Sequence, residues 1–309
     1  MSFARTRPSS SRTSRSRRAR SNDHSQSLGG SHTGRVAATF LVVPQWQGSG
    51  SSRAMRLVDG AEAIRGDLPT TSTVLIDVPL GAGNDEGTRV SRLSSLQAVR
   101  DAQLIALGSI SGLAVTIGGD CGVELASIQH AAAVNDAMAV VWLDAHPDLH
   151  TAESSPSHAF HGMVLRTLLG EGDPSLTPTT PLEVGRLILA GTRALDDAEA
   201  AFVDSAGVRL IAPEQLTAES IRDALTASGA TSVYLHVDLD VLDPAEFTGL
   251  GFPEPFGVTL QSLLEVIAAV KAALPLAGAG ITEFAPRNAT AAGDDLGSIL
   301  RIIGAVSST

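Results

Sequence analysis

Hydrophobic and polar positions along residues 36–309 follow the pattern of strands and helices that alternate along the chain. Apolar segments rich in Val, Ile and Leu predict eight strands, over residues 36–43, 72–78, 113–117, 137–143, 186–190, 208–211, 232–237 and 278–283. Apolar positions at helical spacing predict intervening helices, among them 91–107, 122–133, 213–228 (with Pro213 in first position), 259–273 and 295–306. This alternation predicts a single three-layer α/β domain, a mostly parallel eight-stranded sheet with helices on both faces.

Residues 1–35 have a different composition. They are rich in Ser, Arg and Gly, and eight Arg against one Asp give them a charge of +7. Such a segment cannot bury a core, so we predict a disordered extension over residues 1–35 and a catalytic domain over residues 36–309.

Charge and composition narrow the function of the folded part. The total charge of −11 leaves −18 for residues 36–309, which argues against nucleic-acid binding by this domain. No apolar run approaches the ~20 residues of a membrane span, so no membrane association is predicted. A single cysteine, Cys121, excludes an internal disulfide framework. We therefore expect a reducing, cytoplasmic location.

Potential metal ligands gather where two predicted strands end: Asp144, His146 and Asp148 after one, Asp238 and Asp240 after the other. In extended chain, side chains at alternate positions point to one side. Parallel strands also place their carboxyl ends at one edge of the sheet, where ligands bind. The ordinary alternative is that each Asp caps a turn or helix. Because four carboxylates together would repel one another, we predict two cations, and the donor types favour Mn²⁺ ahead of Mg²⁺ or Zn²⁺.

Three further residues, at predicted strand ends or in the connecting loops, each have two possible roles. Cys121, after a Gly-Gly-Asp turn, is either a small buried residue or a sixth ligand. His161 is either a hydrogen-bonded structural residue or a proton-transfer group. Glu283 ends an apolar strand and needs a partner, which is either a guanidinium substrate or an internal arginine such as Arg193 or Arg287.

Together the motifs resemble the ureohydrolase (arginase/agmatinase) family over residues 36–309. The matching segments are Gly118–Cys121, Asp144–Asp148, His161-Gly162, Asp238–Asp240 with Asp243-Pro244, and Thr282–Pro286. The resemblance implies an eight-stranded α/β fold, two Mn²⁺ per chain and hydrolysis of a guanidino or related amidino carbon. Members of the family often form homo-oligomers, and the sequence leaves the oligomeric state of this chain open.

The resemblance implies roles position by position. One metal would be held by Cys121, Asp144, Asp148 and Asp240, and the other by Asp144, His146, Asp238 and Asp240. Asp148 would orient the attacking water and pass its proton to the leaving amine, His161 would shuttle protons, and Glu283 would bind the guanidinium. The far end of the substrate would meet His150, Ser155, Ser157 and Asp196, for which ordinary loop polarity is the alternative. Many arginases carry a supporting acid where this chain has Ala194.

The main departure from the family is Cys121, because most members have histidine there. With cysteine at this position, the chain resembles the branch of the family that contains N-hydroxy-arginine amidinohydrolase, which yields ornithine and hydroxyurea. We therefore predict an amidinohydrolase for N-hydroxy-arginine or arginine. The alternatives are an agmatinase, guanidinobutyrase or formimidoylglutamase, with residues 249–256 reshaping the pocket, and a non-catalytic homologue.

Overall fold

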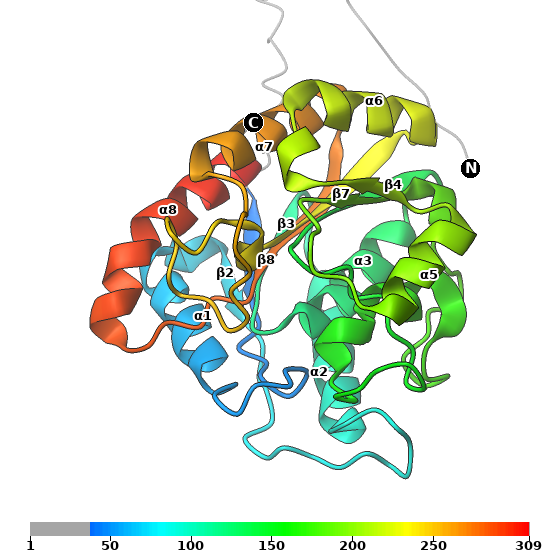
Figure 1. Ribbon diagram of the computed structural model, residues 1–309. Coiled ribbons are helices and arrows are strands. Elements are labelled where there is room, and N and C mark those ends of the chain that lie inside the picture. Colours follow the sequence, from blue (N-terminus) through cyan, green and yellow to red (C-terminus); the bar gives the residue numbers. More distant parts are fainter. Residues whose placement is uncertain (1–37, 309) are drawn as a thin grey trace, which may run out of the picture. The chain divides into compact units, whose positions relative to one another are not determined.

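All eight predicted strands form one sheet in the computed structural model, which describes residues 38–308 (Figure 1). The strands are β1 (Thr39–Val42), β2 (Thr73–Leu75), β3 (Ala114–Ile117), β4 (Met138–Leu143), β5 (Leu187–Ala190), β6 (Arg209–Ile211), β7 (Ser232–Asp238) and β8 (Leu276–Thr282). Their order is β2-β1-β3-β8-β7-β4-β5-β6, and every neighbouring pair is parallel. The predicted extension over residues 1–35 lies outside the described residues.

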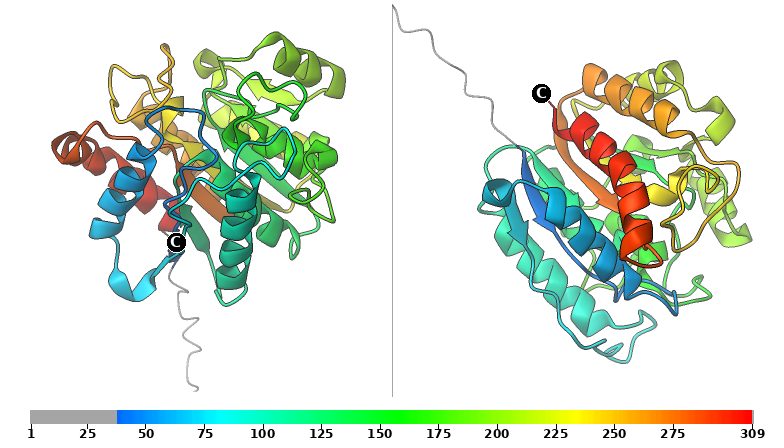
Figure 2. Two further views of the ribbon diagram at one scale, coloured as in Figure 1. Left: turned by 90° about the horizontal axis from the view of Figure 1, so that it is seen from below. Right: turned by 90° about the vertical axis from the view of Figure 1, so that its left-hand side faces the viewer.

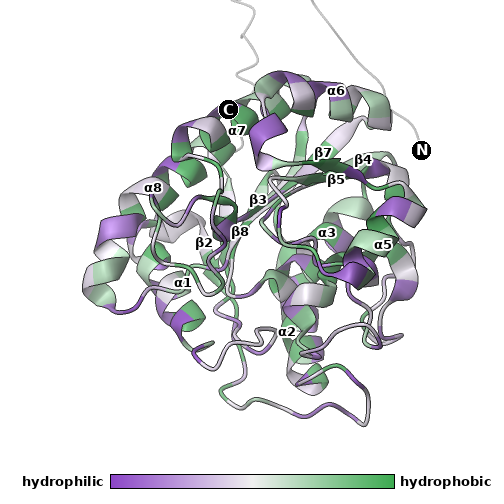
Figure 3. Cartoon of the chain, viewed as in Figure 1, coloured by the Kyte–Doolittle hydropathy of each residue, from purple (hydrophilic) through white to green (hydrophobic). Residues whose placement is uncertain are grey.

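Helices cover both faces of the sheet, which confirms the predicted three layers. One core packs the sheet against α1 (Arg56–Asp67), α6 (Ala218–Ser228), α7 (Leu260–Ala273) and α8 (Ala289–Ser307). The opposite face packs against α2 (Leu93–Leu107), α3 (Glu124–Ala132), α4 (Val164–Arg166) and α5 (Asp197–Ala206). The right-hand view in Figure 2 faces α1, α7 and α8. In Figure 3 the helices alternate between hydrophobic and hydrophilic residues, and β4 and β7 are buried at every position.

Two predicted helix boundaries were wrong for local reasons. Pro213 begins a separate 3₁₀ turn, Pro213–Gln215, rather than the α-helix. Helix α6 begins later because the Thr217 side chain accepts a hydrogen bond from Ser220 N and caps the first turn. Helix α8 is longer than predicted and starts after Asn288, whose side chain caps it by accepting from Ala291 N.

The strand order sets the position of the candidate site. The chain builds β1 to β3 on one side of the sheet and β4 to β6 on the other, and then fills the centre with β7 and β8. Consequently β3, β8, β7 and β4 are neighbours at the point where the strand order reverses. Ile117, Ile281, Val237 and Leu143 pair in one row across them, so the four motif-bearing ends emerge side by side.

Among the described residues, no helix combines the length and the apolarity that crossing a membrane requires.

Candidate metal centre

All six predicted metal ligands line one cavity of about 150 Å³ at the carboxyl ends of the four central strands: Cys121, Asp144, His146, Asp148, Asp238 and Asp240. The same cavity is lined by five other predicted site residues, namely His150, Ser155, Ser157, His161 and Glu283. Asp196 is the only predicted site residue that does not line it. The cavity therefore gathers the chemistry that the sequence places on separate strands.

Two groups of potential ligand atoms share Asp144. Within each group, all the ligand atoms lie within 4.8 Å of one another. Cys121, His236 and Asp238 complete one group, and His146 and Asp240 complete the other. Within them Cys121 Sγ lies 2.9 Å from Asp238 Oδ2, and His146 Nδ1 lies 3.0 Å from Asp240 Oδ2. Two neighbouring positions with one shared carboxylate are what a binuclear centre requires. The sequence reasoning missed His236.

The ligands converge, although the backbone is not extended as the alternating spacing suggested. Strand β4 ends at Leu143, the chain bends directly after it, and Asp148 adopts a positive φ of 50°. Asp144 Oδ1 accepts from His146 N at 2.6 Å, and Asp238 Oδ1 accepts from Asp240 N at 2.7 Å. These aspartates therefore cap turns, as the ordinary alternative proposed, while Asp144 Oδ2 accepts from Trp142 Nε1 at 2.9 Å and Asp238 Oδ2 lies 2.9 Å from Cys121 Sγ.

The buried acids of the cavity disturb one another's ionisation. Burial and the Asp144 charge raise the pKa of Asp240 to about 6. Burial and the Asp240 charge raise the pKa of Asp238 well above the usual range. Burial and the Asp144 charge do the same to the pKa of Asp148. Burial and the Asp238 carboxylate likewise raise the pKa of the Cys121 thiol. This cluster cannot be fully ionised without compensating positive charge, so the donor set fits divalent cations.

Two imidazoles offset part of this negative charge. Burial favours the neutral ring of His146, but the carboxylates of Asp144 and Asp240 outweigh it and raise the His146 pKa to about 12. Burial would also raise the pKa of Asp144, yet its interactions with His146 and His236 hold that pKa below its usual value. Asp144 thus remains a carboxylate at the centre of the cluster.

Glu283 follows β8 in a left-handed conformation, with φ of 64°. Strain of this kind in a non-glycine residue often marks a functional site. Its Oε1 accepts from Cys121 N at 3.3 Å, while its buried Oε2 has no hydrogen-bond partner among the described residues. Arg193 instead donates to backbone carbonyls, and neither Arg193 nor Arg287 forms an ion pair with Glu283 in residues 38–308. The internal-arginine alternative is therefore wrong.

His161 lies beside Glu283, with Nδ1 3.5 Å from Glu283 Oε1. Gly50 N donates to His161 Nε2 at 3.3 Å, so the neutral ring carries its proton on Nδ1, facing Glu283. Burial opposes protonation, but Glu283 raises the His161 pKa. The loop that carries Gly50 is fixed to the Gly-Gly-Asp turn because Gly48 N donates to Asp120 Oδ2 at 2.9 Å.

The predicted substrate-binding loop lies at one side of the cavity, where an unpredicted acid joins it. Asp196 caps α5 through Oδ1, and its Oδ2 lies 3.3 Å from His150 Nε2. Glu199, also in the first turn of α5, is buried and lines the cavity. Its Oε1 accepts from Leu149 N at 3.3 Å. The Asp-x-x-Glu capping pattern of residues 196–199 could have indicated both acids from the sequence.

Residues 249–256 do contribute to the cavity, through Phe252. Its ring centroid lies 5.1 Å from that of His161 and 6.5 Å from that of His146. Arg193 fixes this segment by donating to Glu254 O at 2.8 Å and to Pro255 O at 3.0 Å. Phe252 therefore forms an apolar wall between the two imidazoles.

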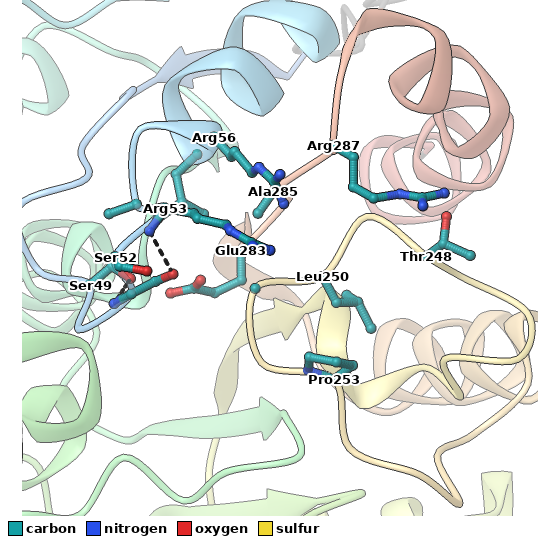
Figure 4. Close-up of a pocket in the computed structure, with 14 residues that line it drawn as sticks. Ser49, Ser52, Arg53, Arg56, Thr248, Leu250, Pro253, Glu283, Ala285 and Arg287 are labelled. Carbon is teal, nitrogen blue, oxygen red and sulfur yellow. Dashed lines mark hydrogen bonds between the residues drawn. The ribbon is translucent and has the colours of Figure 1, made fainter.

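A second cavity, of about 370 Å³, adjoins the first because Glu283 lines both. Its charged lining is otherwise basic, with Arg53, Arg56 and Arg287 around it and Ser49 at its edge (Figure 4). No described residue accepts a hydrogen bond from these three guanidinium groups or forms an ion pair with them.

A sequence profile described as the arginase family matches residues 62–300, and the chain belongs to this family. It is a hydrolase of the class that acts on C–N bonds of linear amidines. The arginase of Bacillus caldovelox is 29% identical over 204 residues, which cover 60% of this chain and 68% of that protein. The arginase of Bacillus subtilis is 30% identical over 158 residues, 48% of this chain and 53% of that protein.

Solved structures share the fold. The B. caldovelox arginase structure has a TM-score of 0.76 at 24% identity, covering 88% of this chain and 98% of that one. Proclavaminate amidino hydrolase from Streptomyces clavuligerus has a TM-score of 0.65 at 21% identity, covering 88% and 90%. A putative agmatinase from Clostridium difficile has a TM-score of 0.66 at 20% identity, covering 88% and 97%. Proteins named for three different substrates thus share this architecture.

Proposed function

We propose that the protein is a binuclear-metal amidinohydrolase that cleaves the guanidino C–N bond of N-hydroxy-arginine or arginine. The single observation that carries the proposal is the cavity in which two ligand groups share Asp144 beside the unpartnered carboxylate oxygen of Glu283. The products would be ornithine and hydroxyurea or urea. A single buried cysteine agrees with a cytoplasmic enzyme.

The donor set fits two divalent cations, which we propose to be Mn²⁺. Asp144, His146, Asp148, Asp238, Asp240 and Cys121 would hold them, since their carboxylates lie buried with raised pKa values or imidazole contacts. A metal pair, when bound, supplies Lewis acidity and a water of lowered pKa as the nucleophile. The bound cations would also allow the aspartates to ionise at neutral pH.

Glu283 is the residue we assign to the guanidinium. Its Oε1 is held by Cys121 N, so Oε2 is left to accept from a planar cation. Hydrogen bonds from the guanidinium to Oε2 would fix the orientation of the carbon that is attacked. Phe252 lines the same cavity, with its ring packed against His161.

Asp148 and His161 are the residues we assign to proton transfer. The Asp148 Oδ2 atom is buried and has no hydrogen-bond partner among residues 38–308, so it can accept a proton from the attacking water and deliver it to the leaving amine. His161 faces Glu283 with its Nδ1 proton and lines the same cavity, which suits it to exchange protons with the departing group.

The far end of an amino-acid substrate would meet the loop side of the cavity. The hydroxyl groups of Ser155 and Ser157 can donate to an α-carboxylate, while Glu199, beside His150 and Asp196, can accept from an α-ammonium. This pairing of hydroxyls with acids favours an α-amino acid over agmatine, which lacks the carboxylate.

A series of substrates tests the assignment. The metal-loaded protein should show its highest kcat/KM on N-hydroxy-arginine or arginine, lower values on guanidinobutyrate and the lowest on agmatine. Activity confined to agmatine, guanidinobutyrate or formimidoylglutamate would contradict the arginine-like substrate. Little or no bound metal after Mn²⁺ loading, together with no turnover of any guanidino compound, would favour a non-catalytic homologue.

A further inference from the structure

A histidine outside the predicted ligand set lies directly under the metal cavity. His236 is on β7, two residues before Asp238, and is fully buried. Its ring stacks on Trp142 with centroids 3.5 Å apart and an interplanar angle of 20°. Its Nε2 lies 3.8 Å from Asp144 Oδ2, and the ring joins Cys121 and Asp238 in one of the two ligand groups.

Glu124 lies on the other side of this ring, with Oε2 3.9 Å from His236 Nδ1. It is fully buried, and neither its carboxylate oxygens nor the His236 nitrogens have hydrogen-bond partners among residues 38–308. Gly280 makes room for the carboxylate, because a Cβ there would lie 1.7 Å from Glu124 Oε1. The chain thus accommodates a buried acid and a buried imidazole that its own hydrogen bonds leave unsatisfied.

Packing alone does not account for the two ring nitrogens. Trp142 Nε1 already donates to Asp144 Oδ2 at 2.9 Å, and His236 Nε2 is too distant for that bond. An apolar ring of the same size would preserve the stacking. An imidazole between a carboxylate and a ligand cluster is, however, the usual arrangement of a metal-binding histidine, whose second nitrogen faces an acid.

We propose that His236 binds the metal at the position bordered by Cys121, with Glu124 as the positioning residue behind it. The inference rests on the metal centre of the proposed function and is independent of the substrate. Thiolate and imidazole donors beside Asp144 and Asp238 would let this position bind borderline-soft cations such as Zn²⁺ or Co²⁺ as well as the proposed Mn²⁺. The position formed by Asp144, His146 and Asp240 is richer in oxygen and suits Mn²⁺. The two positions would then differ in metal preference.

Ring ¹⁵N NMR of histidine-labelled protein, titrated with Zn²⁺, tests this directly. We expect two imidazoles to take on metal-bound shifts, one lost in His146→Gln and the other in His236→Gln. His150→Gln is the matched control from the same cavity and should retain both signals. A single metal-bound imidazole in the wild type, or two that both persist in His236→Gln, would overturn the proposal. The wild-type spectrum remains decisive if His236→Gln fails to fold.

Metal affinity provides a second readout. Glu124→Gln retains the shape and an acceptor for the ring but removes the charge, so its Zn²⁺ affinity should fall about 10- to 100-fold in chelator competition. Unchanged affinity would remove the positioning role. Two metal-bound imidazoles in a protein that hydrolyses no guanidino compound would refute the proposed function and leave this inference standing.

The arginine-lined cavity carries a second, independent inference. Arg53, Arg56 and Arg287 are three of the 14 basic residues in residues 36–309, a segment with a charge of −18. Figure 4 shows Arg53, Arg56 and Arg287 among the residues that line this cavity. Three cations without acidic partners around one cavity create a local positive potential in an acidic domain.

We infer that this cavity binds a carboxylate or phosphate group, carried either by the substrate or by a free anion. Guanidinium groups bind both anions in bidentate geometry, and the serine hydroxyls at the cavity edge can add hydrogen bonds. Glu283 lines both cavities, so a substrate whose guanidinium lies on that acid and whose carboxylate lies here would leave Ser155 and Ser157 without the carboxylate that the proposed function assigns to them.

Thermal unfolding with increasing inorganic phosphate is the test, using wild type, Arg53→Gln/Arg56→Gln/Arg287→Gln and the exposed control Arg301→Gln. Phosphate should stabilise wild type and control saturably and should not stabilise the triple variant. A selective loss of kcat/KM for guanidinobutyrate relative to agmatine would identify a substrate group, whereas unchanged discrimination would identify a free anion. Equal phosphate stabilisation of wild type and triple variant, or none in either, would overturn the inference.

Discussion

The two cavities that meet at Glu283 have opposite charge and different burial. The metal cavity is formed by strand ends, and its carboxylates are nearly inaccessible to solvent. The arginine-lined cavity is formed by the segments around residues 49–57, 248–253 and 283–287, where Arg53 and Arg287 are exposed. Buried acids require compensating ions, while exposed arginines remain solvated without them. The first cavity is therefore suited to chemistry and the second to recognition.

Removing one acid from the metal cavity should have the largest effect. In Asp148→Asn the loss of a ligand and proton acceptor should lower kcat/KM by at least about 1,000-fold. The metal-free variant should be as stable as wild type or more stable, because burial and the Asp144 charge disfavour the ionised Asp148 carboxylate and asparagine carries no charge. Arg56→Gln in the other cavity should retain most of the turnover. Equal losses in both variants, measured on N-hydroxy-arginine and arginine, would break the division between chemistry and recognition.

Changing the softness of one ligand should have a smaller effect. Cys121→His replaces the thiolate with a nitrogen donor, so we expect the variant still to bind two metals. Its kcat and its preference between Zn²⁺ and Mn²⁺ should each change by about 10- to 100-fold. Metal content after equimolar Zn²⁺ and Mn²⁺ loading, together with kcat, measures both. If neither changes, Cys121 is not a ligand.

The loop side of the metal cavity should affect binding more than chemistry. Glu199→Gln should raise KM for α-amino acid substrates about tenfold with kcat nearly unchanged, since an ammonium contact would be lost. Asp196→Asn retains an N-cap, so its effect on stability should be a few tenths of a kcal/mol. Its increase in KM should also be smaller, because one oxygen of Asp196 serves the cap. The reverse order of the two KM effects would assign the ammonium to Asp196.

Metal-free protein should lose stability as pH rises. Asp240 has its pKa raised from 3.8 to about 6 in the folded state, so the folded state binds more protons than the unfolded state between these values. Stability therefore falls as pH increases from 4 toward 6. His146, with its pKa raised from 6.5 to about 12, continues the fall above pH 6.5. We expect Tm to drop by several degrees between about pH 5 and pH 8 in chelator. Metal loading should reverse the slope, and a metal-free Tm that rises over this range would contradict the account.

The sequence predicted the sheet and the ligand cluster because both depend on local patterns. The central strands β4 and β7 are buried at every position, as central strands of a parallel sheet must be, and each ligand motif stands at a strand end. The order β3-β8-β7-β4 could not be derived from the pattern, because strand neighbours depend on the packing of the whole chain. It is nevertheless this order that brings the motifs together.

The residues that sequence reasoning missed are those defined by long-range contacts. His236 lies inside an apolar strand, and only the proximity of Glu124 and Asp144 distinguishes it from a core residue. The arginine-lined cavity combines segments that are more than 190 residues apart in the sequence, so no local motif predicts it. Phe252 also depends on a tertiary contact, because Arg193 fixes its loop from another part of the chain.

The most direct test of the central claim is metal-dependent cleavage of the guanidino bond. The protein should lose hydrolysis of N-hydroxy-arginine and arginine after chelation and regain it as two metals per chain are restored, with ornithine appearing together with hydroxyurea or urea. Hydrolysis that survives complete removal of the metals would contradict the account, as would a protein that binds two metals and releases no ornithine from either substrate.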